Sequence, residues 1–287
     1  MSATPNELIW WPSPAKLNLF LHINGRRADG YHELQSVFQM LSYGDELAFS
    51  VTQSSEIEMA TTLEGVDDKD NLIIKAAKIL QSHLGCQLGC KIHLRKRLPM
   101  GGGIGGGSSN AATTLLVLNH LWKGHLSTHA LATLGLALGA DVPVFVHGHT
   151  AFAEGIGEHL VPIQLEPKVY LVVFPNSHVS TAEIFNAEKL PRNTPKIALA
   201  DYRFDITQND CQNLVLDRYP EVANLLQWLL QFAPSRMTGT GACVFAVFET
   251  EKEAGQVLNQ LPTKWRAFIA NGVDTSPLIN ALNARTE

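Results

Sequence analysis

The sequence contains little cysteine, little charge and no signal for export. Four cysteines occur among 287 residues, and the first residues lack a basic segment followed by an apolar run. A disulfide-stapled secreted scaffold is therefore not expected, and reduced thiols in a cytoplasmic protein are the simplest interpretation. Lysine and arginine number 22 against 27 aspartates and glutamates, so the net charge is −5. This balance argues against a protein that binds nucleic acid through its overall charge.

Long hydrophobic runs are also absent. The stretch 130–146 comes closest, but Asp141 and Pro143 interrupt it, so no membrane-spanning segment is expected. The hydrophobic fraction of 45% nevertheless excludes a disordered chain and is enough for one large or two ordinary domains. Cys86 and Cys90 could begin a metal site, yet no second pair follows at zinc-finger spacing. No zinc site and no obligate protein partner are expected.

Aspartate and glutamate are missing altogether from residues 71 to 140. The same stretch carries seven basic side chains: Lys75, Lys78, Lys91, Arg95, Lys96, Arg97 and Lys123. A segment that binds a polyphosphate benefits from this pattern, because nearby carboxylates would repel the ligand. On charge alone, a solvent-exposed basic helix face and sheet edge would explain the pattern equally well.

The strongest local motif lies inside this acid-free stretch. Six of the seven residues from Gly101 to Gly107 are glycines, and they follow a predicted strand and precede a predicted helix. Because glycine has no Cβ, backbone N–H groups can approach an anion, and the following helix adds its dipole and free amides. Ser108 and Ser109 could cap that helix or offer hydroxyls to a phosphate or to Mg²⁺. The alternative is a flexible loop tip, which would not need to lie between strand and helix.

Two familiar phosphate loops fit this segment poorly. A Walker loop requires a lysine directly after its glycines, and none follows here. A dinucleotide fingerprint matches at Gly101, Gly103 and Gly106, but the acidic residue that would bind a ribose is missing before Asp141. A nicotinamide-dependent dehydrogenase is therefore disfavoured.

Hydrophobic periodicity predicts an α+β protein with two lobes and a cleft between them. Strands are expected over 15–23, 35–41, 46–52, 91–95, 169–174, 242–249 and 265–270, and helices over 71–84, 111–123, 126–138, 221–232 and 251–261. A turn is expected at Asn24–Gly25, a helix N-cap at Asp70 and a proline-bearing loop over 183–194. The strand–helix–strand pattern at the end is typical of half a split βαβ sandwich. We expect two domains, 1–160 and 161–287.

Around the glycines the chain resembles a family of small-molecule kinases. The motif is Pro99-x-x-x-Gly103-Ile104-Gly105, followed by Gly106-Gly107-Ser108-Ser109-Asn110-Ala111-Ala112. It resembles the phosphate motif of the GHMP kinases, which include galactokinase, homoserine kinase and mevalonate kinase. Ile104 stands where the family pattern has leucine, and Gly106 and Gly107 are inserted. This longer form is similar to a subgroup that phosphorylates a cytidine-diphosphate-linked sugar alcohol.

Three further segments carry the same resemblance: 12–19 continuing at 27–32, 138–145, and 235–245. The resemblance implies a two-lobed GHMP-kinase-like fold, with an N-terminal ribosomal-protein-like lobe that binds ATP and a C-terminal ferredoxin-like lobe that binds substrate. It also implies ATP and Mg²⁺ as cofactors, a small cytidine nucleotide as substrate, and transfer of the γ-phosphoryl group to a hydroxyl in the cleft. The rivals are a sister kinase for mevalonate, homoserine or a sugar, and a non-catalytic nucleotide-binding module.

Two residues are implied as catalytic. The resemblance makes Asp141 the proton acceptor and Lys16 its partner in the cleft. Judged from the residues alone, an aspartate before Val-Pro-Val is equally a turn residue or a helix cap, and a lysine in an apolar strand is more often an exposed edge charge. Asp141 is also the first acidic residue after the acid-free stretch, which favours the catalytic role.

The remaining site residues follow from the same resemblance. Tyr31 and Phe185 would sandwich the cytosine, His32 would hydrogen-bond its edge, Asn18 would contact the sugar alcohol, and Thr181 belongs to the same site. The less favoured alternative is that the tyrosine and histidine after Gly30 simply follow a turn and open a half-buried strand. The nucleotide site would comprise Pro99, Met100, Gly101, Gly102, Gly103, Ile104, Gly105, Gly106, Gly107, Ser108 and Ser109, with Asn71 and Lys96 near the adenosine. The Mg²⁺ ligands stay open, with Ser108 or Ser109 as candidates.

Overall fold

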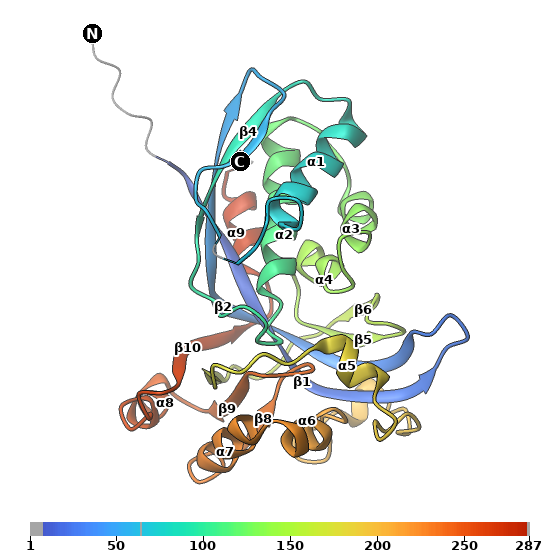
Figure 1. Ribbon diagram of the computed structural model, residues 1–287, viewed down its shortest axis with the longest axis vertical. Coiled ribbons are helices and arrows are strands. Elements are labelled where there is room, and N and C mark those ends of the chain that lie inside the picture. The colour runs from blue at the N-terminus through green and yellow to red at the C-terminus, as the bar shows by residue number, and fades with distance from the viewer. Residues whose placement is uncertain (1–7, 64, 286–287) are drawn as a thin grey trace.

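Two long antiparallel strands form the spine of the molecule. The computed structural model describes residues 8–63 and 65–285, and in it β1 (Trp10–Arg26) and β2 (His32–Thr52) run through both lobes (Figure 1). The two strands predicted at 35–41 and 46–52 are therefore one strand, and that prediction was wrong. Gly44 lets β2 lie close against β1, because a Cβ there would lie 2.1 Å from the Ser13 carbonyl oxygen. Only glycine permits such close approach of the two backbones.

The turn between β1 and β2 lies four residues later than predicted. Asn24 and Gly25 belong to β1, and the chain reverses at residues 28–30, where Gly30 has a φ of +91°. The Asp29 carboxylate accepts a hydrogen bond from the Tyr31 amide at 3.1 Å, as an aspartate in a tight turn commonly does. The Asn24 side chain instead donates to the Thr194 carbonyl at 2.9 Å, so it stabilises a contact between lobes.

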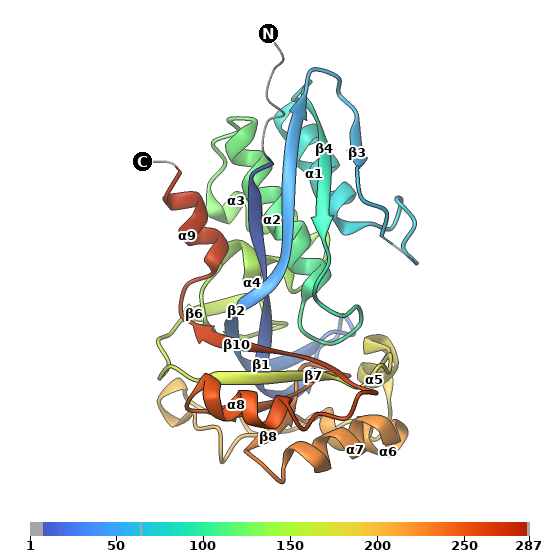
Figure 2. The same ribbon diagram turned by 90° about the vertical axis from the view of Figure 1, so that its left-hand side faces the viewer.

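The first lobe is a sheet covered on one face by helices (Figures 1 and 2). Two further strands of its sheet pair with β2: β4 (Gly89–Arg95) and β5 (Ala151–Glu154). In turn, β3 (Ile57–Met59) pairs with β4, and β6 (His159–Pro162) pairs with β5. The helices are α1 (Leu72–Leu84), α2 (Gly106–Leu121), α3 (Thr128–Leu136) and α4 (Val142–His147). Sheet and helices enclose one apolar core that includes Ile73, Ile92 and Leu115.

The second lobe contains the predicted split βαβ unit. Its sheet has the order β10-β7-β9-β8, formed by β7 (Val169–Phe174), β8 (Ser235–Met237), β9 (Val244–Phe248) and β10 (Arg266–Val273). β9 and β10 are both antiparallel to β7, and helix α8 (Glu251–Leu258) connects them. Helices α5 (Thr181–Asn186), α6 (Gln212–Arg218) and α7 (Pro220–Leu229) complete the lobe, with a short 3₁₀ helix at Leu199–Asp201. The α+β class and the split βαβ end are confirmed.

Several connections cross between the lobes. The β1–β2 hairpin reaches the second lobe, and β10 pairs with β2 at Gly272–Leu41 and Val273–Met40. The last helix, α9 (Pro277–Asn283), returns to the first lobe, where Leu278 lies in the same buried cluster as Trp11. The division at residue 160 stays a prediction. No described helix has the length and apolarity needed to cross a membrane.

Several helix boundaries differ from the predicted ones for local reasons. Asn71, not Asp70, caps α1, because its side-chain oxygen accepts from the Ile73 amide at 2.9 Å. Helix α2 begins at Gly106 rather than at residue 111, so the last two glycines of the run are helical. Their low helix propensity is overridden by the fold around them. Part of the predicted loop 183–194 is likewise helical, as the end of α5.

Candidate active site

The glycine loop has a shape that side chains would disrupt. Gly101, Gly103 and Gly105 have φ values of +70°, +74° and +73°, a region that other residues rarely adopt. A Cβ on Gly103 would lie 2.6 Å from the Thr238 carbonyl oxygen, and one on Gly105 would lie 2.6 Å from the Phe145 ring. The loop is therefore wedged between the two lobes, directly before the N-terminus of α2.

A buried carboxylate that sequence reasoning missed holds the start of this loop. Asp45 of β2 is 1% exposed, and one of its oxygens accepts from the Arg97 and Leu98 amides at 2.7 and 2.8 Å. The other oxygen lies 2.6 Å from the Lys96 ammonium and accepts from Asn110 of α2 at 3.1 Å. One side chain thus joins β2, the segment before the glycines and α2. The only signal was an acidic residue at the edge of an apolar strand pattern.

The two serines after the glycines have different surroundings. The Ser109 hydroxyl is fully buried and accepts from the Ser13 hydroxyl at 3.0 Å. Ser13 in turn accepts from the Asn110 side chain at 2.8 Å, so these residues fasten α2 to β1. Ser108, in contrast, lines both of the cavities described next. Of the two candidates for a cation or phosphate ligand, Ser108 is the one that the fold presents to a ligand.

A cavity of about 370 Å³ lies on one side of the glycine loop. Its lining includes Asn71, Lys96 and the whole run 99–108, which is every residue predicted for the nucleotide except Ser109. The Asn71 side chain is engaged in capping α1, and the Lys96 ammonium is paired with Asp45. Their side chains are thus committed to the fold, and the loop amides are the groups left to face a phosphate.

A second cavity of about 520 Å³ lies on the other side of the loop, in the cleft between the lobes. It is lined by all of the residues predicted as catalytic or substrate-binding: Lys16, Asn18, Tyr31, His32, Asp141, Thr181 and Phe185. Gly103, Gly105 and Ser108 line both cavities. The glycine loop is therefore a shared wall between two adjoining sites.

Lys16 and Asp141 form an ion pair at the floor of the cleft. The Lys16 ammonium lies 3.2 Å from an Asp141 oxygen, and the two side chains are 3% and 39% exposed. The ammonium also donates to the Asn18 side-chain oxygen at 2.6 Å and lies 5.0 Å from the centre of the Phe38 ring. Asp141 directly precedes α4 but makes no side-chain capping bond, so its oxygens stay available to a ligand. Lys16 is not an exposed edge charge.

Asn18 orients this lysine through a chain of hydrogen bonds. The Asn18 amide nitrogen donates to the Ser36 hydroxyl at 2.9 Å, which fixes its oxygen toward Lys16. The Ser36 hydroxyl in turn donates a hydrogen bond to the Phe20 carbonyl at 2.6 Å. The Asn18 backbone N–H donates to the Thr238 hydroxyl of the second lobe at 2.8 Å. The lysine end of the ion pair is thus built from both lobes.

The aromatic end of the cavity is arranged differently from the expected sandwich. His32 stacks on Phe185, with ring centres 5.3 Å apart and planes inclined by 27°. Tyr31 stands at the rim, 59% exposed, directly after the turn. Burial lowers the pKa of His32, and the nearby Arg192 and Arg26 lower it further. A neutral imidazole therefore faces the cavity near pH 7.

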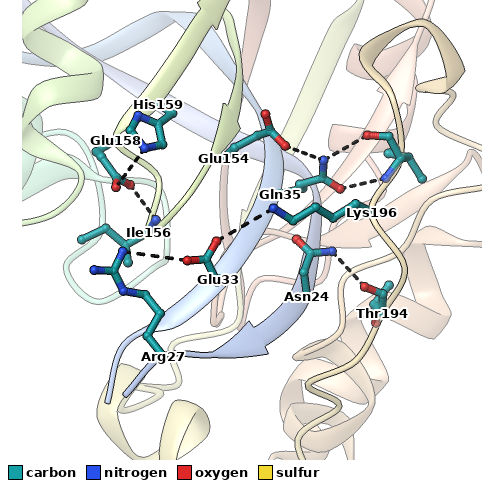
Figure 3. A network of polar contacts seen from close by, with 11 residues as sticks. Asn24, Arg27, Glu33, Gln35, Glu154, Ile156, Glu158, His159, Thr194 and Lys196 are labelled. Atoms are coloured by element: carbon teal, nitrogen blue, oxygen red, sulfur yellow. Dashed lines mark hydrogen bonds and ion pairs between the residues drawn. The ribbon is translucent and has the colours of Figure 1, made fainter. Parts of the chain in front are cut away.

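A segment of the second lobe whose contacts sequence analysis missed binds the residues at this aromatic end of the cavity. Residues 190–197, which we call the strap, run alongside the β1–β2 hairpin (Figure 3). The Arg192 Nε donates to His32 Nε2 at 3.0 Å. Gln35 donates to the Ile197 carbonyl at 3.0 Å and accepts from its amide at 2.9 Å. Further along, Lys196 and Glu33 form a weak pair at 4.0 Å. These contacts join residues about 160 positions apart, so no local pattern could reveal them.

The chain is similar to known proteins over almost its whole length. Residues 71–149 match the family described as GHMP kinases N terminal domain, and residues 196–267 match GHMP kinases C terminal. The chain is 64% identical, over 273 residues, to 4-diphosphocytidyl-2-C-methyl-D-erythritol kinase of Pseudoalteromonas atlantica, covering 95% of this chain and 96% of the relative. It is 55% identical to the protein of that name from Shewanella loihica, covering 96% and 97%.

Solved structures extend the comparison to the fold. A crystal structure of 4-(cytidine 5′-diphospho)-2C-methyl-D-erythritol kinase matches with a TM-score of 0.82 and 31% identity, covering 92% of this chain and all of that one. The mevalonate kinase of Methanococcus jannaschii matches with a TM-score of 0.65 at 18% identity, covering 95% of this chain and all of that one. At that lower identity the likeness concerns the fold alone.

Proposed function

The chain belongs to the GHMP kinase family, and from this premise we propose that it transfers the γ-phosphoryl group of ATP to the 2-hydroxyl of 4-(cytidine 5′-diphospho)-2-C-methyl-D-erythritol. This is a step of the non-mevalonate route to isoprenoid precursors. Relatives at 64% and 55% identity over nearly their full length carry the name of that kinase. All four cysteines are free, which suits a reducing compartment, and we place the reaction in the cytoplasm.

One observation supports this proposal most directly: two cavities share the glycine loop as a wall. Phosphoryl transfer needs the donor phosphate and the acceptor hydroxyl in line and in close proximity. ATP in the smaller cavity would present its phosphates to the loop amides and to the N-terminus of α2. An acceptor in the cleft would meet the γ-phosphoryl group where Gly103, Gly105 and Ser108 line both sites.

The ion pair in the cleft supplies the remaining chemistry. Asp141 would accept the proton of the substrate hydroxyl as the bond to phosphorus forms. Lys16, held by Asn18 at 2.6 Å, would compensate charge on the transferred group and hold the acceptor oxygen. Because the transition state is loose, positioning and charge compensation contribute more than the strength of the base.

Mg²⁺ fits this site as an ion that arrives with ATP. The described residues contain no cluster of three or more carboxylates, histidines and cysteines that could hold a metal by itself. Mg²⁺ usually keeps several waters and binds phosphate oxygens with one or two protein oxygens. The Ser108 hydroxyl would be such a ligand, and the bound ion would neutralise phosphate charge.

The aromatic end of the cleft would recognise the cytosine. His32 would offer a ring nitrogen to the base edge, while Phe185 and the exposed Tyr31, which line the same cavity, would offer ring faces. Stacking on an aromatic face is worth about 1–3 kcal/mol per base. Tyr31 would close on the base as substrate enters.

The test is steady-state release of ADP from Mg·ATP, with the cytidine substrate, mevalonate and homoserine as alternative acceptors. We expect turnover with the cytidine substrate alone. Turnover with mevalonate or homoserine instead would keep the mechanism but refute the acceptor and the roles of Tyr31, His32 and Phe185. No ADP with any acceptor, from folded protein that binds ATP, would favour a non-catalytic nucleotide-binding module.

A further inference from the structure

Arg192 makes an unusually complete set of hydrogen bonds at the edge of the cleft. Its Nε donates to His32, and its two Nη atoms donate to four backbone carbonyls, those of Phe185, Ala187, Glu188 and Leu190, at 2.8 to 3.5 Å. A guanidinium has five N–H groups, and these five contacts use all of them. Arg192 therefore connects the end of α5, which carries Phe185, to the ring that stacks on Phe185.

The contact with His32 determines which ring nitrogen carries the proton. Arginine can only donate, so His32 Nε2 must be the acceptor in the 3.0 Å contact. A neutral imidazole has one N–H, which then sits on Nδ1. Within the described structure Nδ1 has no hydrogen-bond partner, and the residue lines the substrate cavity. Burial and the two neighbouring arginines lower the pKa of His32, which disfavours the doubly protonated ring.

We propose that Arg192 is a positioning residue that fixes His32 as its Nδ1–H tautomer and thereby sets the preference of the site for cytosine over uracil. The two bases differ at ring nitrogen N3, which is an acceptor in cytosine and carries a hydrogen in uracil. A donor held rigidly at Nδ1 satisfies the first and opposes the second. This inference rests on the proposed function, since it concerns the base of the same substrate.

The strap gives this arrangement its rigidity. Thr194 donates its amide to the Ile23 carbonyl at 3.1 Å and accepts from Asn24 at 2.9 Å, so the chain just after Arg192 is fastened to β1 (Figure 3). Gln35, 1% exposed, clamps Ile197 from the β2 side. Arg192 therefore approaches His32 from a segment fixed on both strands of the hairpin. Discrimination against a wrong hydrogen-bond pattern is large when the site cannot rearrange.

The first test reads the tautomer without turnover. In the full chain labelled with ¹⁵N-histidine, long-range ¹H–¹⁵N correlation distinguishes an Nδ1–H ring from an Nε2–H ring, and a His32→Gln variant assigns the signal. We expect His32 to show the Nδ1–H pattern and Arg192→Met to shift it toward Nε2–H or an average. The matched control Arg203→Met removes an arginine paired with exposed Asp205 and should leave the pattern unchanged. An unchanged tautomer in Arg192→Met would overturn the proposal.

The second test measures base selectivity. We expect Arg192→Met to lower the ratio of kcat/KM for the cytidine substrate to that for its uridine counterpart by about 10–100-fold, mainly through KM. Arg192→Lys should not restore it, since three donors on a point charge cannot replace five in a planar fork.

Loss of α5 alone could also weaken binding, so a double variant separates the two explanations. On a His32→Gln background, Arg192→Met should cause no further loss of selectivity if it acts through the ring. A full additional loss would assign Arg192 a purely structural role. If the unmodified enzyme did not use the cytidine substrate at all, the proposed function would fail while the tautomer result still stood.

Discussion

Replacing Asp141 with asparagine separates an effect on catalysis from an effect on folding. Asparagine keeps the shape and one oxygen but removes the charge and the ability to accept a proton. The 3.2 Å contact with Lys16 corresponds to a Coulomb attraction of roughly 5 kcal/mol at an effective dielectric of about 20. Most of this is offset, because Asp141 is 39% exposed and Lys16 is desolvated.

The expected effects on stability and on rate therefore differ. The unfolding free energy should fall by only about 1–3 kcal/mol, because the Lys16 ammonium keeps its 2.6 Å bond to Asn18. We expect kcat to fall by about 10²–10⁴-fold, which corresponds to about 3–5 kcal/mol of lost transition-state stabilisation. The KM for ATP should change little, since Asp141 lines the cleft and not the nucleotide cavity.

The assay is ADP release at saturating cytidine substrate, combined with urea unfolding of the same preparation. Asp205→Asn is the matched control, because the Asp205 side chain is 66% exposed, pairs with Arg203 and lines neither cavity. Its kcat should equal that of the unmodified enzyme. A kcat for Asp141→Asn within about tenfold of normal, from stably folded protein, would refute Asp141 as proton acceptor.

Three further predictions concern Asp45, Gly105 and His22. Asp45→Asn should raise the KM for ATP at least about tenfold and lower the unfolding free energy by about 2–4 kcal/mol, because it removes the charge that holds Lys96 and the loop amides; an unchanged KM would contradict this role. Gly105→Ala should lower kcat/KM at least about 100-fold, because its Cβ would lie 2.6 Å from Phe145 at a φ of +73°, whereas Gly255→Ala in open space on α8 should not lower it. Burial lowers the pKa of His22, so below about pH 6.5 the unfolded chain binds more protons at this residue than the folded chain does. The stability that neutral His22 contributes should therefore be fully present above that pH. Below it, the free energy of unfolding in urea should decline by at most about 1.4 kcal/mol per pH unit for this group. A flat profile between pH 7.5 and 5.5 would contradict the shift.

Features encoded by adjacent residues could be predicted from the sequence. The strand Val169–Phe174 has the predicted bounds, because a run of apolar residues buried on both faces leaves no alternative. The glycine run also predicted its loop from adjacent residues alone, since several of its positions need a positive φ. The resemblance to GHMP kinases also proved sound, and every substrate-site residue taken from it lines the cleft.

Features that depend on long-range register could not be predicted. Asp45 acts on amides about 50 positions away, and Arg192 acts on His32 160 positions away. Their roles exist only once β2 lies beside the glycine loop and the strap beside the hairpin. The misplaced turn has a similar origin: Asn24–Gly25 is a good turn pair in isolation, yet the fold uses Asn24 to bind Thr194 and turns at Asp29–Gly30 instead.

The return of α9 to the first lobe has a consequence for synthesis of the protein. Leu278 belongs to the same buried cluster as Trp11 and Leu115, so the first lobe lacks part of its core until residue 278 has been synthesised. At ~5–20 residues per second, roughly 6–25 s separate the emergence of β5 from that of Leu278. During this interval the nascent lobe exposes the apolar surface that α9 covers in the folded protein. The core of the first lobe can therefore be completed only after the second lobe has been synthesised.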